Sequence, residues 1–157
     1  MNGLLSLFSR RAEFFDDEID LCLSDDEVKD DMCGIRDGYV FYIYRHKTRH
    51  YMGYISLRLG ESPSLYYLGH IGYRIDPEYR GHGYAQRACR LMKPLLEHLG
   101  IRTAVITTDV DNIASRKTCE ALGCVLERIA PVPEEYRIIC SGSQNKCRYI
   151  WIIDDHE

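Results

Sequence analysis

The fold of this chain is decided by one stretch, Tyr73-Arg74-Ile75-Asp76-Pro77-Glu78-Tyr79-Arg80-Gly81-His82-Gly83-Tyr84-Ala85. Its order predicts the end of a strand, a turn at Asp76-Pro77, a glycine loop and the start of a helix. The first N–H groups of a helix have no partner within it, and the helix dipole adds partial positive charge there. A glycine loop that leads into a helix therefore suits a phosphate or a pyrophosphate.

Three kinds of phosphate-binding loop contain glycines in a similar arrangement. A P-loop needs Gly, four residues and then Gly-Lys-Ser/Thr, and the sequence has no such run. A dinucleotide fingerprint needs a third glycine where Gln86 stands. The third pattern, Arg/Gln-x-x-Gly-x-Gly/Ala, is met by Arg80, Gly83 and Ala85. An ordinary glycine-rich turn is the alternative, and the flanking strand and helix count against it.

A second stretch, Asp109-Val110-Asp111-Asn112-Ile113-Ala114-Ser115-Arg116-Lys117-Thr118-Cys119-Glu120-Ala121-Leu122-Gly123-Cys124, follows after an intervening strand. By itself it could be an ordinary capped helix, since Asp and Asn are good N-caps. With the glycine loop it resembles the GNAT N-acetyltransferases, nearest the branch of ribosomal-protein N-terminal acetyltransferases. The two motifs cover residues 68–127, residues 38–67 fit by pattern only, and 1–37 and 130–157 match weakly.

The resemblance implies an α/β (α+β) fold in a single acetyltransferase domain over residues 1–157. Its sheet would be mixed, mostly antiparallel and twisted, with helices on both faces and splayed central strands. Acetyl-CoA, the cosubstrate, would lie in the gap, with its pantetheine arm along the backbone of Tyr73, Arg74 and Ile75. The resemblance places the pyrophosphate and the rest of the pantetheine near Arg80, Gly81, His82, Gly83, Tyr84, Ala85, Asn112 and Ser115.

The implied activity is direct transfer of the acetyl group to a primary amine. A non-catalytic acyl-CoA-binding or sensing module on the same fold is the alternative. Many family members place a Tyr, as the acid toward the CoA sulfur, where this chain has Cys119. Cys119 is favoured as a small buried apolar residue, and the acid is then dispensable or comes from Tyr84 or Tyr73. His70 is a candidate base, although a structural or surface role is favoured, and no base is assigned.

Apolar alternation and helical periodicity predict the remaining elements. Strands are expected at 19–23, 38–44, 51–59, 65–75, 101–108 and 124–129, with a last strand or pair from 137–139 and 146–153. Helices are expected at 84–99 and 113–122, and a docking helix at 1–12. Gly69 and Gly72 inside the expected strand 65–75 indicate a bulge or a close backbone approach by another group.

Composition narrows the functional classes. The length of 157 residues fits one domain, and the net charge of −4 argues against nucleic acid as the main partner. No apolar run approaches the length of about 18 residues that a membrane span needs. The seven cysteines contain no CxxC pair, so no zinc or other metal site is expected, and reduced thiols indicate a cytoplasmic protein.

The acceptor is left open between a small-molecule amine and a protein N-terminus, and a homodimer is also left open. Ten acidic residues lie between positions 13 and 31. A solvated face is the favoured interpretation of this run. The functional alternative is that the run attracts a cationic amine acceptor.

Overall fold

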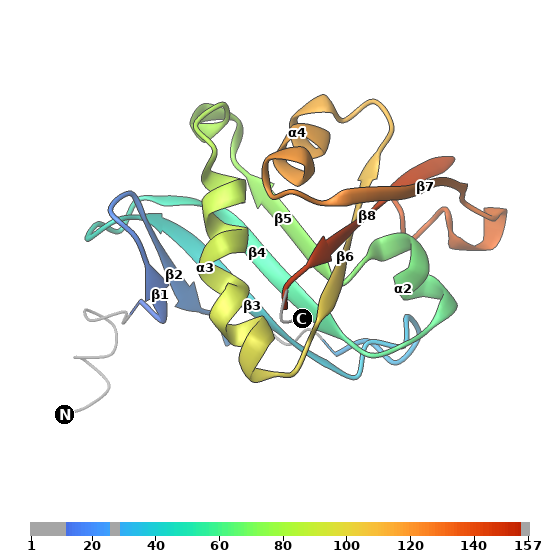
Figure 1. Ribbon diagram of the computed structural model, residues 1–157, viewed down its shortest axis with the longest axis horizontal. Coiled ribbons are helices and arrows are strands. Elements are labelled where there is room, and N and C mark those ends of the chain that lie inside the picture. The colour runs from blue at the N-terminus through green and yellow to red at the C-terminus, as the bar shows by residue number, and fades with distance from the viewer. Residues whose placement is uncertain (1–11, 26–28, 155–157) are drawn as a thin grey trace.

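The computed structural model describes residues 12–25 and 29–154, which form one twisted sheet with helices packed against it (Figure 1). The strands run in the order β1-β2-β3-β4-β5-β6-β8-β7. Every neighbouring pair is antiparallel except β5 and β6, as the mixed, mostly antiparallel sheet requires. The strands are β1 (Phe14–Phe15), β2 (Ile19–Leu23), β3 (Asp37–Arg45), β4 (Tyr51–Leu59), β5 (Ile71–Ile75), β6 (Thr103–Asp109), β7 (Val125–Pro131) and β8 (Asn145–Ile152).

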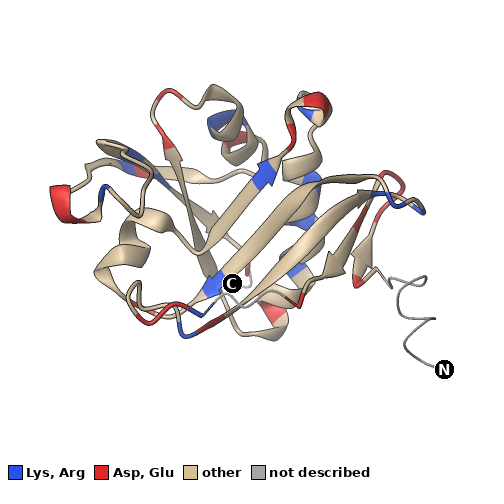
Figure 2. Cartoon of the chain, turned by 180° about the vertical axis from the view of Figure 1, so that it is seen from behind, with Lys and Arg blue, Asp and Glu red and all other residues tan. Residues whose placement is uncertain are grey.

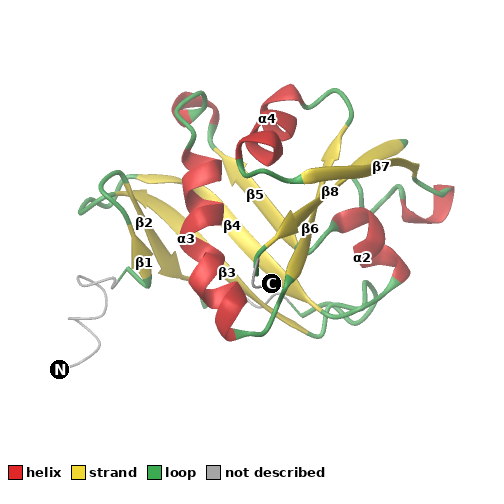
Figure 3. Ribbon diagram, viewed as in Figure 1, coloured by secondary structure: helices red, strands yellow, loops and turns green. Residues whose placement is uncertain are grey.

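The main core lies between the sheet and the long helix α3 (Tyr84–His98), which crosses one face of it (Figure 3). Alternate strand residues such as Ile19, Leu21, Ile55 and Leu57 point to this face and are fully buried. The helix packs against this face with small or apolar residues at helical spacing, namely Ala85, Ala88, Cys89, Met92 and Leu96. The small residues at the start of α3 let its N-terminus lie close to the sheet.

The expected strand 65–75 is wrong over its first part, because residues 63–68 form the helix α2 (Pro63–Leu68). The Ser62 side chain accepts a hydrogen bond from Leu65 N, and Pro63 occupies the first turn, where its missing N–H costs nothing. Gly69 ends the helix with a φ of 76°. The glycine that suggested a strand bulge is therefore a helix cap.

The helices lie on both faces of the sheet. Ala104 and Ile106 of β6 point into the core beneath α3, so Thr107 points to the other face. There its hydroxyl donates to the Tyr67 carbonyl of α2 over 2.8 Å. A second, smaller apolar cluster forms around α2 from Cys33, Ile35, Leu65, Leu68 and Ile139.

Of the last strand or pair expected from 137–139 and 146–153, only the second stretch forms a strand. Residues 137–139 follow the short 3-10 turn η2 (Glu134–Tyr136) and continue in turns, with Ile138 89% exposed. A single last strand, β8, pairs with both β6 and β7. The hairpin of β3 and β4 is confirmed, whereas the docking helix expected at 1–12 lies outside the described residues except for position 12.

The central strands separate where the site forms. β5 and β6 are paired only at Ile71 and Ile106, and beyond this point β5 continues to Ile75 and β6 to Asp109 along diverging paths (Figure 1). The outer backbone edge of β5 therefore faces an open gap. No helix within residues 12–25 and 29–154 is long and apolar enough to cross a membrane.

Candidate functional site

The glycine loop connects the end of β5 to the start of α3, through the 3-10 turn η1 (Pro77–Tyr79). Gly81 and Gly83 have φ angles of 86° and 75°, which side chains other than glycine adopt only with strain. The first helical bond of α3 runs from Arg87 N to Gly83 O. The preceding N–H groups, those of Tyr84, Ala85 and Gln86, therefore have no acceptor in the helix.

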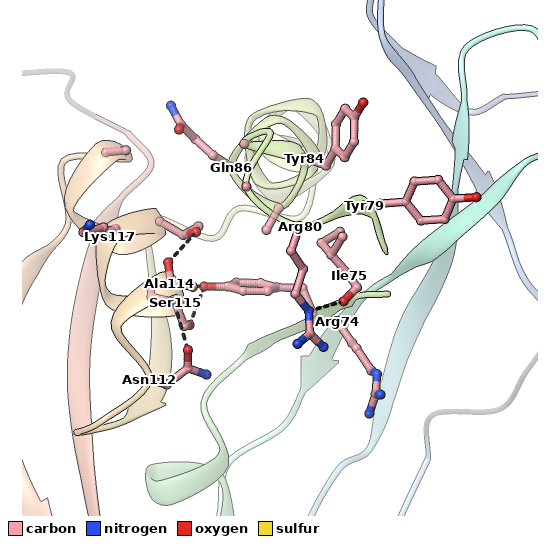
Figure 4. A pocket seen from close by; sticks show the side chains of 16 residues that line it. Arg74, Ile75, Tyr79, Arg80, Tyr84, Gln86, Asn112, Ala114, Ser115 and Lys117 are labelled. Carbon is pink, nitrogen blue, oxygen red and sulfur yellow. Dashed lines mark hydrogen bonds between the residues drawn. The ribbon is translucent and has the colours of Figure 1, made fainter. Parts of the chain in front are cut away.

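The loop is anchored to the sheet by Arg80. Its Nε donates to the Ile75 carbonyl at the end of β5 over 2.7 Å (Figure 4). The outward side of the loop is open, because a Cβ atom added at Gly81 would meet no atom within 4 Å. The loop is thus held in place from the strand side and accessible from the other.

The opposite wall is the start of helix α4 (Ile113–Ala121), and Asn112 determines where it begins. The Asn112 side-chain oxygen accepts a hydrogen bond of 3.1 Å from Ser115 N, which makes Asn112 the N-cap. The Ser115 hydroxyl lies 2.8 Å from the hydroxyl of Tyr73 on β5. The two walls are therefore bridged by one pair of hydroxyl groups.

A pocket of about 670 Å³ lies between the glycine loop and α4. Every residue expected to hold the cosubstrate lines this pocket except His82. His82 is exposed and lines a neighbouring depression. The lining of the pocket also includes residues that were not expected, namely Tyr79, Gln86, Ala114, Lys117, Thr118 and Ala121. Ala114, Lys117, Thr118 and Ala121 share one face of α4 at helical spacing. This face could have been predicted from the sequence by counting along the helix from Asn112.

The charges around this pocket are one-sided. Arg74, Arg80 and Lys117 are the charged residues of its lining, which contains no acid. Three cations and the start of α3 therefore surround the same space, and this combination suits a polyanion. The unpaired edge of β5 offers backbone N–H and C=O groups to an extended ligand, as an added strand would use them.

A second pocket of about 330 Å³ adjoins the first. Three residues line both pockets, Tyr73, Asn112 and Ser115. The second pocket is otherwise formed by β4, β5 and β6, by the end of α2, by the start of β8 and by the segment at 139–141. Its charged groups are Arg58, Asp109 and Lys146. Two ligands that occupied the two pockets would meet at Tyr73 and Ser115.

The weak catalytic candidates are placed differently from one another. Cys119 is fully buried, bonds with Cys124 and Tyr73, and does not line either pocket. The hydrogen bond to Cys124, together with burial, raises its pKa, so the thiol stays neutral and is a packing residue. Tyr84 lines the first pocket, with its ring 5.6 Å from that of His82.

His70 is oriented by the sheet rather than by either pocket. Its ring Nδ1 accepts a hydrogen bond from Val105 N over 3.1 Å, and the backbone N–H of His70 donates to the Val105 carbonyl. Burial lowers its pKa, and the nearby cations Arg148 and Arg58 lower it further. His70 is therefore a neutral imidazole held by a backbone bond, which is a structural role.

The described part of the acidic run, residues 13–25 and 29–31, does not line either of the pockets that meet at Tyr73. Asp16, Asp17 and Glu18 form ion pairs with Arg87 on α3, and Asp20 bonds to His46. Figure 2 shows the acidic residues mostly in turns and loops at the ends of the strands. The described part of the run therefore does not supply the negative field that a cationic acceptor would need.

The comparisons with known proteins agree with this architecture. Residues 7–125 match the model of the family described as Acetyltransferase (GNAT) domain. The search of curated proteins found no significant sequence match.

Solved acetyltransferases share the fold. The ribosomal-protein-S5-alanine acetyltransferase from Vibrio fischeri has 22% identity and a TM-score of 0.60, over 76% of this chain and 64% of that chain. The microcin C7 self-immunity acetyltransferase, solved with acetyl-CoA and AMP, has 22% identity and a TM-score of 0.56, over 73% and 61%.

The acetyl transferase from Salmonella typhimurium that modifies the N-terminal serine of ribosomal protein L7/L12 has 24% identity and a TM-score of 0.56, over 74% and 64%. This chain thus spans less than two thirds of each of these proteins. Since the family model covers most of the sequence, the chain belongs to the GNAT acetyltransferase family.

Proposed function

We propose that this chain is an N-acetyltransferase that moves an acetyl group from acetyl-CoA to a primary amine by direct attack. The observation that carries the proposal is the meeting of two pockets at Tyr73 and Ser115. One pocket has the charge and the helix terminus that a pyrophosphate requires, and the other is open to an acceptor.

Acetyl-CoA fits the first pocket in one direction. Its pyrophosphate would accept hydrogen bonds from the free N–H groups at the start of α3, with Arg80 and Lys117 nearby. Its pantetheine arm would run along the open edge of β5, past Arg74 and toward Tyr73. This direction brings the thioester to the place where the second pocket begins.

The reaction needs the amine in its neutral form. The α-amino group of a protein N-terminus has a pKa of about 7.7–8.0, so releasing its proton at pH 7 costs on the order of 1 kcal/mol. For an alkyl ammonium, with a pKa of about 10.4, the cost is on the order of 4–5 kcal/mol. The neutral nitrogen then attacks the thioester carbon, the N–C bond forms, and the nitrogen releases its second proton to water. The C–S bond breaks, and CoA leaves as a thiolate. Because a thiol has a pKa of about 8.5, this thiolate needs only modest help from an acid.

Tyr73 is the group best placed to give that help. Its hydroxyl lies at the junction of the two pockets and is bonded to Ser115. Burial raises the pKa of the phenol, so Tyr73 carries its proton at neutral pH. We assign to Tyr73 the role of proton donor to the leaving sulfur, which many family members give to a Tyr at the position of Cys119. Because burial disfavours the phenolate, Tyr73 regains a proton from water in the pockets that it lines.

A protein N-terminus is the proposed acceptor. The likeness to acetyltransferases that act on ribosomal proteins supports this choice, and the second pocket is open at the surface, as a peptide end requires. The seven cysteines are all free thiols, which supports a cytoplasmic location.

The test is release of free thiol from acetyl-CoA in the presence of a panel of short peptides with free N-termini and of small amines. We expect at least one peptide to accelerate thiol release well above the rate of hydrolysis, with the acetyl group found on the α-amine by mass spectrometry. If CoA binds but no amine accelerates thiol release, the chain is the acyl-CoA-binding or sensing module instead. If neither acetyl-CoA nor CoA binds, the proposal fails.

A further inference from the structure

Arg58, on β4, places its guanidinium over the backbone of the neighbouring strand β5. Nη1 donates to the carbonyl oxygens of Leu68 and Gly69 at the end of α2, each over 3.1 Å. A Cβ atom at Gly72 would lie 2.5 Å from Nη2. Gly72 therefore leaves the space that this side chain fills, and the close approach that the glycine predicted is made by Arg58.

Arg58 has no counter-ion among the residues that the structure describes. The ion pairs of this part of the chain join other cations, including Arg87 with Asp16, Lys146 with Asp109 and Arg148 with Glu127. Burial lowers the pKa of Arg58, and no carboxylate acts on it in the opposite direction. A guanidinium nevertheless stays charged in proteins.

Arg58 is half-buried, so its charge loses part of its hydration and gains no ionic partner among the described residues. No buried side-chain nitrogen of the described residues lacks a partner, so the unpaired groups of Arg58 remain accessible to solvent. The two backbone carbonyls satisfy only Nη1. Nε and Nη2 have no acceptor among the described residues, and together they form one side of the planar fork that binds a carboxylate with two parallel hydrogen bonds.

Arg58 and Gly72, over which Nη2 packs, both line the second pocket. The other charged groups of the wall, Asp109 and Lys146, are paired with each other over 2.8 Å. The wall thus carries two cations and one acid, a formal charge of 2 − 1 = +1, and Arg58 is the unpaired member. Gly72, beneath the guanidinium, directly precedes Tyr73, so Arg58 lies one residue along β5 from the junction of the two pockets.

We propose that Arg58 binds a carboxylate of the acceptor, so that the pocket selects amines that carry an acidic group close to the reacting nitrogen. This inference rests on the proposed transferase function. Since consecutive Cα atoms are about 3.8 Å apart, an acidic side chain on the second residue of a peptide acceptor matches the short separation along β5. The proposal replaces the cationic acceptor that the acidic run suggested with an anionic one.

The experiment compares matched peptides, Ser-Glu-Ala-Ala and Ser-Gln-Ala-Ala, which differ in one charge and hardly in shape. Binding to the protein saturated with CoA is measured by calorimetry, and acetylation is measured separately with acetyl-CoA. We expect the Glu peptide to bind and react at least about tenfold better, in line with a charge-assisted hydrogen-bonded pair. The α-amides of glutamate and glutamine form a second pair, in which only the side chain can carry a carboxylate, and this pair distinguishes a small amino-acid derivative from a peptide as the source of the carboxylate.

Arg58→Gln removes the charge, and we expect it to abolish the preference for Glu by weakening the Glu peptide while the Gln peptide changes little. Arg58→Lys keeps the charge but loses the fork, and we expect an intermediate preference. Arg74→Gln is the matched control, an exposed cation on β5 that lines only the first pocket. It should weaken CoA while leaving the ratio of Glu to Gln binding unchanged.

The proposal is overturned if wild-type protein binds the two members of each pair equally well, a result that needs no variant. It is also overturned if the preference persists in a folded Arg58→Gln protein, with folding checked by thermal unfolding and CoA affinity. Because binding is scored with CoA, failure of this inference is distinct from failure of the proposed function, which would appear as an absence of thiol release with bound peptide.

Discussion

The hydroxyl of Tyr73 on β5 lies 2.8 Å from the hydroxyl of Ser115 on α4, across the gap between the two pockets. Tyr73 comes from the strand that would hold the pantetheine, and Ser115 from the helix that follows the second motif. Since Cys119 lies buried beside the same phenol, the ring of Tyr73 occupies the region that a tyrosine at position 119 would need. The tyrosine hydroxyl at this place therefore comes from Tyr73 on β5 and not from position 119 on α4.

Tyr73→Phe removes only this hydroxyl. We expect kcat to fall by about ten- to a hundredfold, at the lower end of general acid effects because the thiolate leaves readily. CoA affinity should change less than about threefold, since the ring and the strand edge remain. Steady-state kinetics and calorimetry with CoA measure the two quantities.

Tyr84→Phe is the control, because Tyr84 lines only the first pocket. It should retain kcat within about threefold. An unchanged kcat in Tyr73→Phe, or a larger loss in Tyr84→Phe, would remove Tyr73 from the mechanism.

The phosphate loop is tested with Gly83→Val. A side chain at Gly83 would project beside the free N–H groups of α3, and the φ of 75° would also be strained. We expect CoA affinity to fall at least about tenfold. Gly142→Val supplies the control, because Gly142 has a φ of 85°, an equally open environment and no place in the first pocket.

Both variants should lose stability to a similar extent, and only Gly83→Val should lose CoA. Calorimetry gives the affinities, and thermal unfolding gives the stabilities. Equal CoA affinities in the two variants would mean that the pyrophosphate does not bind at this loop.

Local signals explain which parts of the structure could be predicted from the sequence. The glycine loop, the N-cap at Asn112 and the extent of the helix α3 each depend on neighbours in the chain, and all three have the expected geometry. Helix α2 also has local signals, since Ser62-Pro63 is a helix start and Gly69 a helix end. The apolar run Leu65-Tyr66-Tyr67-Leu68 nevertheless led to the prediction of a strand, because periodicity cannot distinguish a strand from a helix in so short a run.

The second pocket had no such signal. Arg58 reaches it only because β4 pairs with β5, α2 ends beside it, and Gly72 leaves room for its guanidinium. Ile138 and Ile139 show the converse. They are equally apolar in sequence, yet Ile138 is 89% exposed whereas Ile139 packs beside α2, which only the tertiary fold determines.

Cys119→Ala tests the packing role of the buried thiol. Because Cys119 is fully buried and neutral, we expect a loss of stability of roughly 1 kcal/mol from the small cavity and kcat within about threefold of wild type. Cys119→Tyr should instead destabilise by about 1–3 kcal/mol or more through overpacking against Tyr73.

Chemical denaturation and steady-state kinetics measure the two effects in Cys119→Ala. A loss of kcat greater than about a hundredfold, in a folded protein that still binds CoA, would make Cys119 a catalytic residue and contradict its assignment as packing.

A stabilising role for the acidic run is tested at Asp16. Its carboxylate pairs with Arg87 and so joins the turn before β2 to α3. Burial raises the pKa of Asp16, but hydrogen bonds from Ile19 N and from the Arg87 guanidinium outweigh it and hold the pKa below its usual 3.8. A carboxylate with a depressed folded-state pKa stabilises the protein above its unfolded-state pKa, and this contribution is lost as the pH falls through the folded-state value.

We therefore expect Asp16→Asn to lower the free energy of unfolding at pH 7 by about 1 kcal/mol, since the Arg87 pair is partly exposed. The difference from wild type should begin to shrink below about pH 4, where the unfolded state binds the proton, and it is lost as the pH falls through the lower folded-state pKa. Asp17→Asn is the control, because its carboxylate is 86% exposed although it also contacts Arg87, and we expect a change under about 0.5 kcal/mol at either pH. Urea unfolding at pH 7 and pH 3 measures all three proteins. A difference between wild type and Asp16→Asn that is as large at pH 3 as at pH 7 would show that the Asp16 side chain stabilises the turn by its shape and not by its charge.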